Sequence, residues 1–138
     1  MFYKLVINKA TGSISSLFDK ELNQELIDSQ NPYNMGQPIR ETSAKRDIAP
    51  FNHTTVSNVK VDNGVSGNVW ESVKISADLE GFDKGTEGSP KGIETEIRLY
   101  KNVKKIEFRY MAHKQIITDP EALYVAFPFS LPGSRIVF

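Results

Sequence analysis

Strict alternation of apolar and polar residues in two neighbouring segments constrains this chain more than any other feature of its sequence. Residues 93–99 place Ile, Thr, Ile and Leu on odd positions and charged side chains on even ones, and residues 105–112 alternate in the same way. Successive side chains of a strand point to opposite faces, so this pattern is typical of strands with one buried face. The two segments therefore predict an antiparallel hairpin that lies on a core.

Charge decides the register expected for this hairpin. A slip of two residues keeps both faces intact but sets like charges opposite each other. Opposed unlike charges contribute roughly 0.2–1 kcal/mol per pair, whereas like charges cost energy. The register that matches both charge and apolar character predicts a turn within residues 101–104, with Leu99 opposite Ile106, Arg98 opposite Glu107 and Glu96 opposite Arg109.

The rest of the chain reads as further short strands separated by turn signals, with almost no helix. Strands are expected at residues 2–7, 13–18, 25–27, 54–61, 69–79 and 122–129, and Asp62-Asn63-Gly64 is a tight-turn signal. This organisation indicates an all-β fold, an antiparallel β-sandwich of the supersandwich kind. We expect residues 1–138 to form a single β-sandwich domain, or a truncated portion of a larger one, with another strand starting at residues 135–138.

One long segment, residues 29–52, carries no clear strand pattern. Pro32, Pro38, Pro50 and Gly36 interrupt it, and charges of both signs are mixed through it. A long excursion of this kind in a compact domain is often functional. We expect an irregular, largely exposed loop.

Composition excludes several classes of function. The chain has 17 basic and 17 acidic residues, whereas a nucleic-acid surface needs a basic excess, so we expect no nucleic-acid partner. No apolar run has transmembrane length, so we expect no membrane partner. The chain enters a strand at Phe2, which predicts no signal peptide at its start. Without cysteine there is no thiolate metal site and no thiol nucleophile.

Two segments carry a family resemblance. YKLVINKATGSISSLFDKELNQELID, at residues 3–28, resembles the start of the β-sandwich region of glycoside hydrolase family 38, the α-mannosidases. TEIRLYKNVKKIEFRYMAHK, followed by EALYVAFPF, resembles a later segment of the same region, up to Phe129. The sandwich is shared in outline with galactose-mutarotase-like domains.

The resemblance implies an accessory role beside an upstream catalytic domain. In that family the zinc ion and an aspartate nucleophile lie in the catalytic domain, so this chain is expected to need no cofactor and to have that domain as its partner. In that family the sandwich can contribute residues to the pocket for a mannose-containing glycan, and the resemblance implies that the loop after Asp28 contributes them here. Relatives carry an aromatic near the position of Pro38, and the aromatic near it here is Tyr33. The candidates for carbohydrate contact are Tyr33, Gln37 and Arg40.

The residues give little support for catalysis or metal binding by this chain alone. His53 and His113 are not in a metal-binding spacing, and Glu94 and Glu96 read as ion-pair partners of Arg109. No catalytic residue and no metal ligand is therefore assigned. The aromatics of the strands, Trp70, Tyr124, Phe127 and Phe129, are expected in the core, and stacking on a sugar is the alternative for them. Two alternatives stay open, a stand-alone carbohydrate-binding module and, less favoured, a mutarotase-like enzyme pairing His113 with Glu121 or Glu94.

Overall fold

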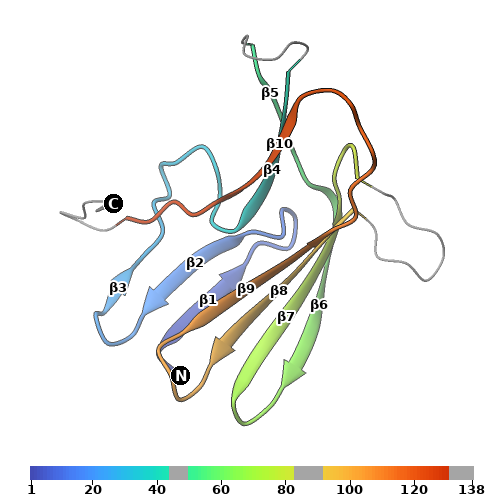
Figure 1. Cartoon of the computed structure of the whole chain (residues 1–138). Coiled ribbons are helices and arrows are strands. Elements are labelled where there is room, and N and C mark those ends of the chain that lie inside the picture. The colour runs from blue at the N-terminus through green and yellow to red at the C-terminus, as the bar shows by residue number, and fades with distance from the viewer. Residues whose placement is uncertain (44–49, 83–91, 131–138) are drawn as a thin grey trace.

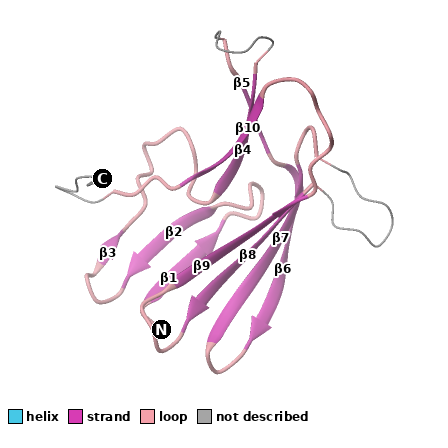
Figure 2. Ribbon diagram, in the orientation of Figure 1, coloured by secondary structure: helices cyan, strands magenta, loops and turns pink. Residues whose placement is uncertain are grey.

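The structure, a computed structural model, describes residues 1–43, 50–82 and 92–130. These residues form ten strands in three antiparallel sheets and contain no helix (Figure 2). The first sheet has the order β1-β2-β3, with β1 Tyr3–Ile7, β2 Ile14–Asp19 and β3 Gln24–Glu25. The second has the order β10-β4-β5, with β10 Glu121–Ala126, β4 Gln37–Thr42 and β5 Asn52–Thr55. The third has the order β6-β7-β8-β9, with β6 Ser57–Ser66, β7 Trp70–Asp78, β8 Ile93–Tyr100 and β9 Ile106–Ala112.

Two of these sheets form the sandwich. One face of β1-β2-β3 packs against one face of β6-β7-β8-β9, and six buried apolar residues join them, Ile14, Leu17, Leu26, Met35, Ile75 and Ile97. Burying an aliphatic side chain of this size contributes roughly 1.5–3 kcal/mol. A second small cluster, around Phe82 and Ile93, closes the end of the sandwich nearest β4 and β5. The all-β sandwich predicted from the sequence is confirmed.

The hairpin β8–β9 has the register predicted from charge. Leu99 lies opposite Ile106 and Glu96 lies opposite Arg109, with the turn at residues 101–104. The close ion pairs, however, run along the strands: Arg98 contacts Glu96 at 2.7 Å and Arg109 contacts Glu107 at 2.8 Å. The register is confirmed, whereas Glu96 takes Arg98 as its partner.

The tight turn expected at Asp62-Asn63-Gly64 is wrong. Strand β6 continues through these residues to Ser66, and the chain turns at residues 67–69. The pairing of β6 with β7 shifts between Asn63 and Ser66. A Cβ atom at Gly64 would lie 2.2 Å from the hydroxyl oxygen of Ser72. This glycine therefore serves a close approach of two strands, which produces the same sequence signal as a turn.

The irregular, exposed loop expected at residues 29–52 is also wrong in its central part. Residues 37–42 form β4, the middle strand of its sheet, and Ile39 and Arg40 are buried. Pro38 is tolerated because it lies opposite Val125 at a position where the ladder needs no amide from β4. Residues 44–49 lie outside the described residues. In Figure 1 the sheet β10-β4-β5 rises from one end of the sandwich.

None of the four aromatics expected in the core belongs to the two core clusters, so this prediction is wrong. Trp70 is half-buried, whereas Tyr124, Phe127 and Phe129 are 43–50% exposed. The strand expected at residues 135–138 lies outside the described residues. Among the residues described, no helix has the length and apolar character that a membrane crossing requires.

A buried carboxylate ties the two layers of the sandwich at one end. Asp19, at the end of β2, is 1% exposed and lies 2.9 Å from the ammonium group of Lys104 in the β8–β9 turn. Its other oxygen accepts hydrogen bonds from the amides of Glu21 and Leu22. The hydrogen bond from Lys104, helped by these amides, lowers the pKa of Asp19 below its ordinary value of 3.8.

This tie predicts a particular response to acid. A carboxylate whose pKa is lowered by folding stabilises the protein above its unfolded-state pKa, and the stabilisation is lost as pH falls through the folded-state pKa. Asp19→Asn should therefore be less stable than the parent at pH 7, and the difference should shrink as pH falls below about 4. Urea unfolding at several pH values measures it. Asp62→Asn, at an exposed ion pair, is the control, and a difference for Asp19→Asn that stays constant with pH would contradict the tie.

Candidate functional site

Four polar side chains converge on one face of the sheet β10-β4-β5. Glu41 on β4 and His53 on β5 lie opposite each other in the register, and the imidazole Nε2 is 2.7 Å from a Glu41 oxygen. The Tyr33 hydroxyl lies 3.2 Å from Nδ1 of His53, and the Tyr124 hydroxyl donates to Glu41 over 3.4 Å. We call Tyr33, Glu41, His53 and Tyr124 the Tyr33 cluster.

The donor pattern of the Tyr33 cluster follows from its chemistry. A carboxylate only accepts hydrogen bonds, so Nε2 of His53 must donate to Glu41. In a neutral imidazole the other nitrogen then accepts, and the Tyr33 hydroxyl donates to Nδ1. The Tyr33 ring also meets the imidazole edge-on, with centroids 6.2 Å apart. The loop that carries Tyr33 is thereby fixed to β5.

Arg40 points to the opposite face of the same sheet, because neighbouring residues of a strand alternate. Its Nε donates to Glu121 over 2.8 Å, its terminal nitrogen lies 3.5 Å from Glu80, and Lys114 also contacts Glu121. We call these four residues the Arg40 cluster. Arg40 is 8% exposed, and a Cβ atom at Gly81 would lie only 2.8 Å from its guanidinium carbon. The Arg40 cluster therefore connects the sheet to the sandwich.

The three predicted carbohydrate contacts thus occupy different environments. Tyr33 is half-buried within the Tyr33 cluster, Arg40 is held by two carboxylates, and Gln37 is buried while its side-chain oxygen accepts from the Asn34 amide at 2.7 Å. The structure brings Tyr33 together with Glu41, which was not among the predicted site residues, and with Tyr124, which was expected in the core. No local pattern could have found them, because they meet only through pairings between distant strands.

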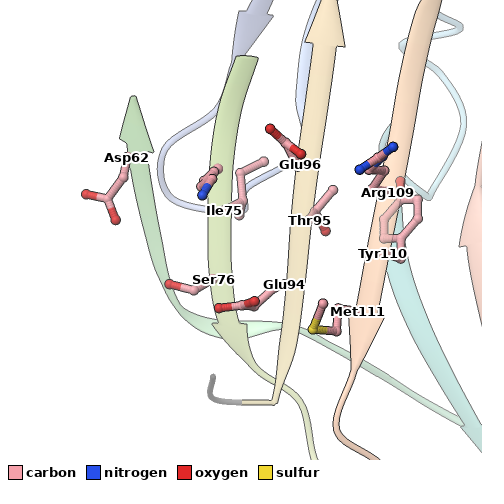
Figure 3. A pocket seen from close by; sticks show the side chains of 10 residues that line it. Asp62, Ile75, Ser76, Glu94, Thr95, Glu96, Arg109, Tyr110 and Met111 are labelled. Carbon is pink, nitrogen blue, oxygen red and sulfur yellow. The ribbon is translucent and has the colours of Figure 1, made fainter. Parts of the chain in front are cut away.

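A shallow hollow of about 500 Å³ lies on the four-stranded sheet (Figure 3). A row of charges with alternating sign crosses the sheet here, formed by Asp62, Lys74, Glu96 and Arg109. Glu94 points toward Ser76 on the next strand. Charges that alternate in this way satisfy one another and suit a hydrated surface.

Two acids of this sheet, Glu96 and Glu107, have pKa values held below the ordinary value. The hydrogen bond from Arg98 lowers the pKa of Glu96, with smaller contributions from Ser72 and Lys74. Hydrogen bonds from Arg109 and Tyr100 lower the pKa of Glu107 to about 2. A glycosidase acid needs a raised pKa so that it can protonate the leaving group. Glu96 and Glu107 are therefore unsuited to that role.

The other candidate chemistries lack a matching geometry. Among the described residues, no group of three or more histidines, aspartates or glutamates could hold a metal ion, so these residues do not fit the zinc of the resemblance. Nε2 of His113 is buried without a hydrogen-bond partner, so the structure pairs it with neither Glu121 nor Glu94. Glu41 and His53 bond to each other, whereas an acid and a base must flank their substrate.

Fold and site together describe an all-β domain with an exposed polar and aromatic face and no assembled catalytic centre among the described residues. The family model of the "Glycosyl hydrolases family 38 C-terminal domain" matches residues 1–138. The chain therefore belongs to this family, and its class is that of an accessory domain of a glycoside hydrolase. Searches among curated proteins and among solved structures each found no match.

The Arg40 cluster gives a test of how the sheet is attached. Arg40→Met keeps the apolar stem but leaves Glu121 and Glu80 without the guanidinium. Removing one partner of a buried ion pair costs about 3–5 kcal/mol, and the remaining Lys114 should keep the loss near 3 kcal/mol. Urea unfolding followed by circular dichroism measures it. Lys101→Met, which removes an exposed pair with Glu71, should cost less than about 1 kcal/mol, and equal losses in the two variants would refute the attachment.

Proposed function

We propose that this domain supports the catalytic domain of an α-mannosidase-like glycoside hydrolase and presents the Tyr33 cluster to a mannose-containing glycan. The domain adds contact area and no chemical step. The observation that carries the most weight for this proposal is the convergence of two tyrosine hydroxyls on the Glu41–His53 pair at a half-exposed surface. Catalysis belongs, in this proposal, to a separate domain that would hold the zinc ion.

The chemistry of the Tyr33 cluster suits a sugar. A sugar offers apolar ring faces to aromatic side chains and many hydroxyl groups to hydrogen bonds. Tyr124 is 50% exposed and Tyr33 is half-buried, so their rings remain accessible from solvent. Glu41 accepts and the tyrosine hydroxyls both donate and accept, which matches the dual character of sugar hydroxyls. Gln37 and Arg40 act on this site indirectly, by holding the loop and the strand.

The geometry favours a weak site that needs a second surface. The Tyr33 cluster lies on the surface and encloses a ligand from one side, whereas tight small-molecule sites bury most of the ligand. This favours a wall of a cleft between two domains over the alternative of a stand-alone carbohydrate-binding module. A millimolar dissociation constant corresponds to about −4.1 kcal/mol, a value in keeping with a few exposed contacts.

Titration of the ¹⁵N-labelled chain with methyl α-mannoside tests the site. We expect millimolar binding, with amide and imidazole shifts concentrated at Tyr33, His53 and the facing residues of β4. Tyr33→Ala should weaken binding about tenfold or more, because it removes a ring and the hydrogen bond to His53, a loss of about 1.4 kcal/mol or more.

Leu22→Ala serves as the matched control, since Leu22 is 60% exposed in the β2–β3 turn, on another sheet. It should leave the dissociation constant unchanged. Shifts scattered over the sheet β6-β7-β8-β9, or binding that Tyr33→Ala does not weaken, would contradict a glycan contact at the Tyr33 cluster. Micromolar affinity in the isolated chain would favour the stand-alone module.

A further inference from the structure

Within residues 1–43, 50–82 and 92–130, strand β10 has one edge that pairs with no other strand, and we call it the open edge. Strand β10 is the outermost strand of the sheet β10-β4-β5, and its pairing with β4 runs from Glu121 to Ala126 without a register shift. The amide of Ser43 donates to the carbonyl of Pro120, and antiparallel ladders alternate bonded and non-bonded pairs. Tyr124 is therefore in a bonded pair, whereas Leu123 and Val125 direct their amides and carbonyls away from β4.

This edge lacks the features that usually protect one. Natural edge strands carry lysines, prolines or bulges that discourage a further strand. Residues 121–126 read Glu-Ala-Leu-Tyr-Val-Ala, and the one charge, Glu121, is already bound by Arg40 and Lys114. The Leu123 side chain is 40% exposed and that of Tyr124 is 50% exposed. No described residue occupies this edge. It is therefore apolar, and its outward backbone groups can form further hydrogen bonds.

We propose that the open edge of β10 binds the same edge of a second copy of this chain, in antiparallel pairing about a two-fold axis. The outward backbone groups require that Leu123 and Val125 pair with outward-facing residues of the partner, and among those pairings the proposed one centres on Tyr124. Leu123 then pairs with the partner's Val125, and Val125 with the partner's Leu123, so that both residues exchange two hydrogen bonds. Two three-stranded sheets become one continuous sheet of six strands.

Self-pairing is favoured over another occupant because the edge is complementary to itself. In this register Tyr124 faces the partner's Tyr124 in a non-bonded pair, where side chains come closest. Apolar side chains meet apolar side chains along the centre, and no like charges oppose each other. A hollow of about 320 Å³ lined by Phe82, Ala112 and Leu123 opens beside the edge.

Sedimentation velocity of the 138-residue chain over a range of concentrations tests the proposal. The mass should rise from 15.5 kDa toward twice that value and stop there, because a two-fold contact closes on itself. Leu123→Lys should weaken the dimer at least about tenfold, since it places a charge at the centre of the paired edges. Leu22→Lys, at an exposed position of the β2–β3 turn, should leave it unchanged.

A double variant fixes the register. Leu123→Lys combined with Val125→Glu sets each lysine opposite the partner's glutamate, so the dimer should return. Circular dichroism and thermal melting confirm that each variant folds. A parent chain that stays at 15.5 kDa up to its solubility limit, growth beyond a dimer, or a dimer that Leu123→Lys leaves intact would each overturn the proposal.

Discussion

The face-to-face contact between β1-β2-β3 and β6-β7-β8-β9 is the constraint on which the other parts depend. Ile14 and Met35 are 1% and 0% exposed, and both belong to this contact. The amide of Ile14 donates to the carbonyl of Met35, and this hydrogen bond fixes the chain to the core just before β4 begins. Because Gly36 follows in the left-handed region, with φ of 75°, the chain turns there and enters the sheet that carries the Tyr33 cluster.

Electrostatic contacts then determine how the third sheet sits on this frame. The side chains of Arg40 and Glu121 are only 9% and 12% exposed, so loss of the guanidinium leaves the Glu121 carboxylate without its buried partner. The exposed pair of Lys60 and Asp62 on the sandwich is of a different kind, since exposed pairs contribute little to stability. The same residue types thus have a structural role on one sheet and a solubility role on the other. Burial distinguishes them, and composition does not.

The sequence was sufficient for the hairpin β8–β9 because its information is local. Alternation sets the faces, and opposed charges choose between registers that differ by two residues. Strand β4 was missed because its partner β10 begins about 80 residues later in the chain, and Pro38 made it look irregular. The turn predicted at Gly64 was wrong because one local signal has two structural causes. A close contact between strands and a tight turn both require a glycine. Of the candidate site, the sequence found Tyr33 and missed the neighbours that distant pairings bring to it.

The central claim is that β4 is a fully formed strand that presents the Tyr33 cluster from a rigid sheet. Amide hydrogen exchange of Ile39 and Glu41, measured against Ile97 of the sandwich core, tests it most directly. The account predicts that the amides of β4 exchange through global unfolding, with protection comparable to that of Ile97. Exchange of Ile39 and Glu41 at the rate of an unstructured loop, while Ile97 remains protected, would contradict it.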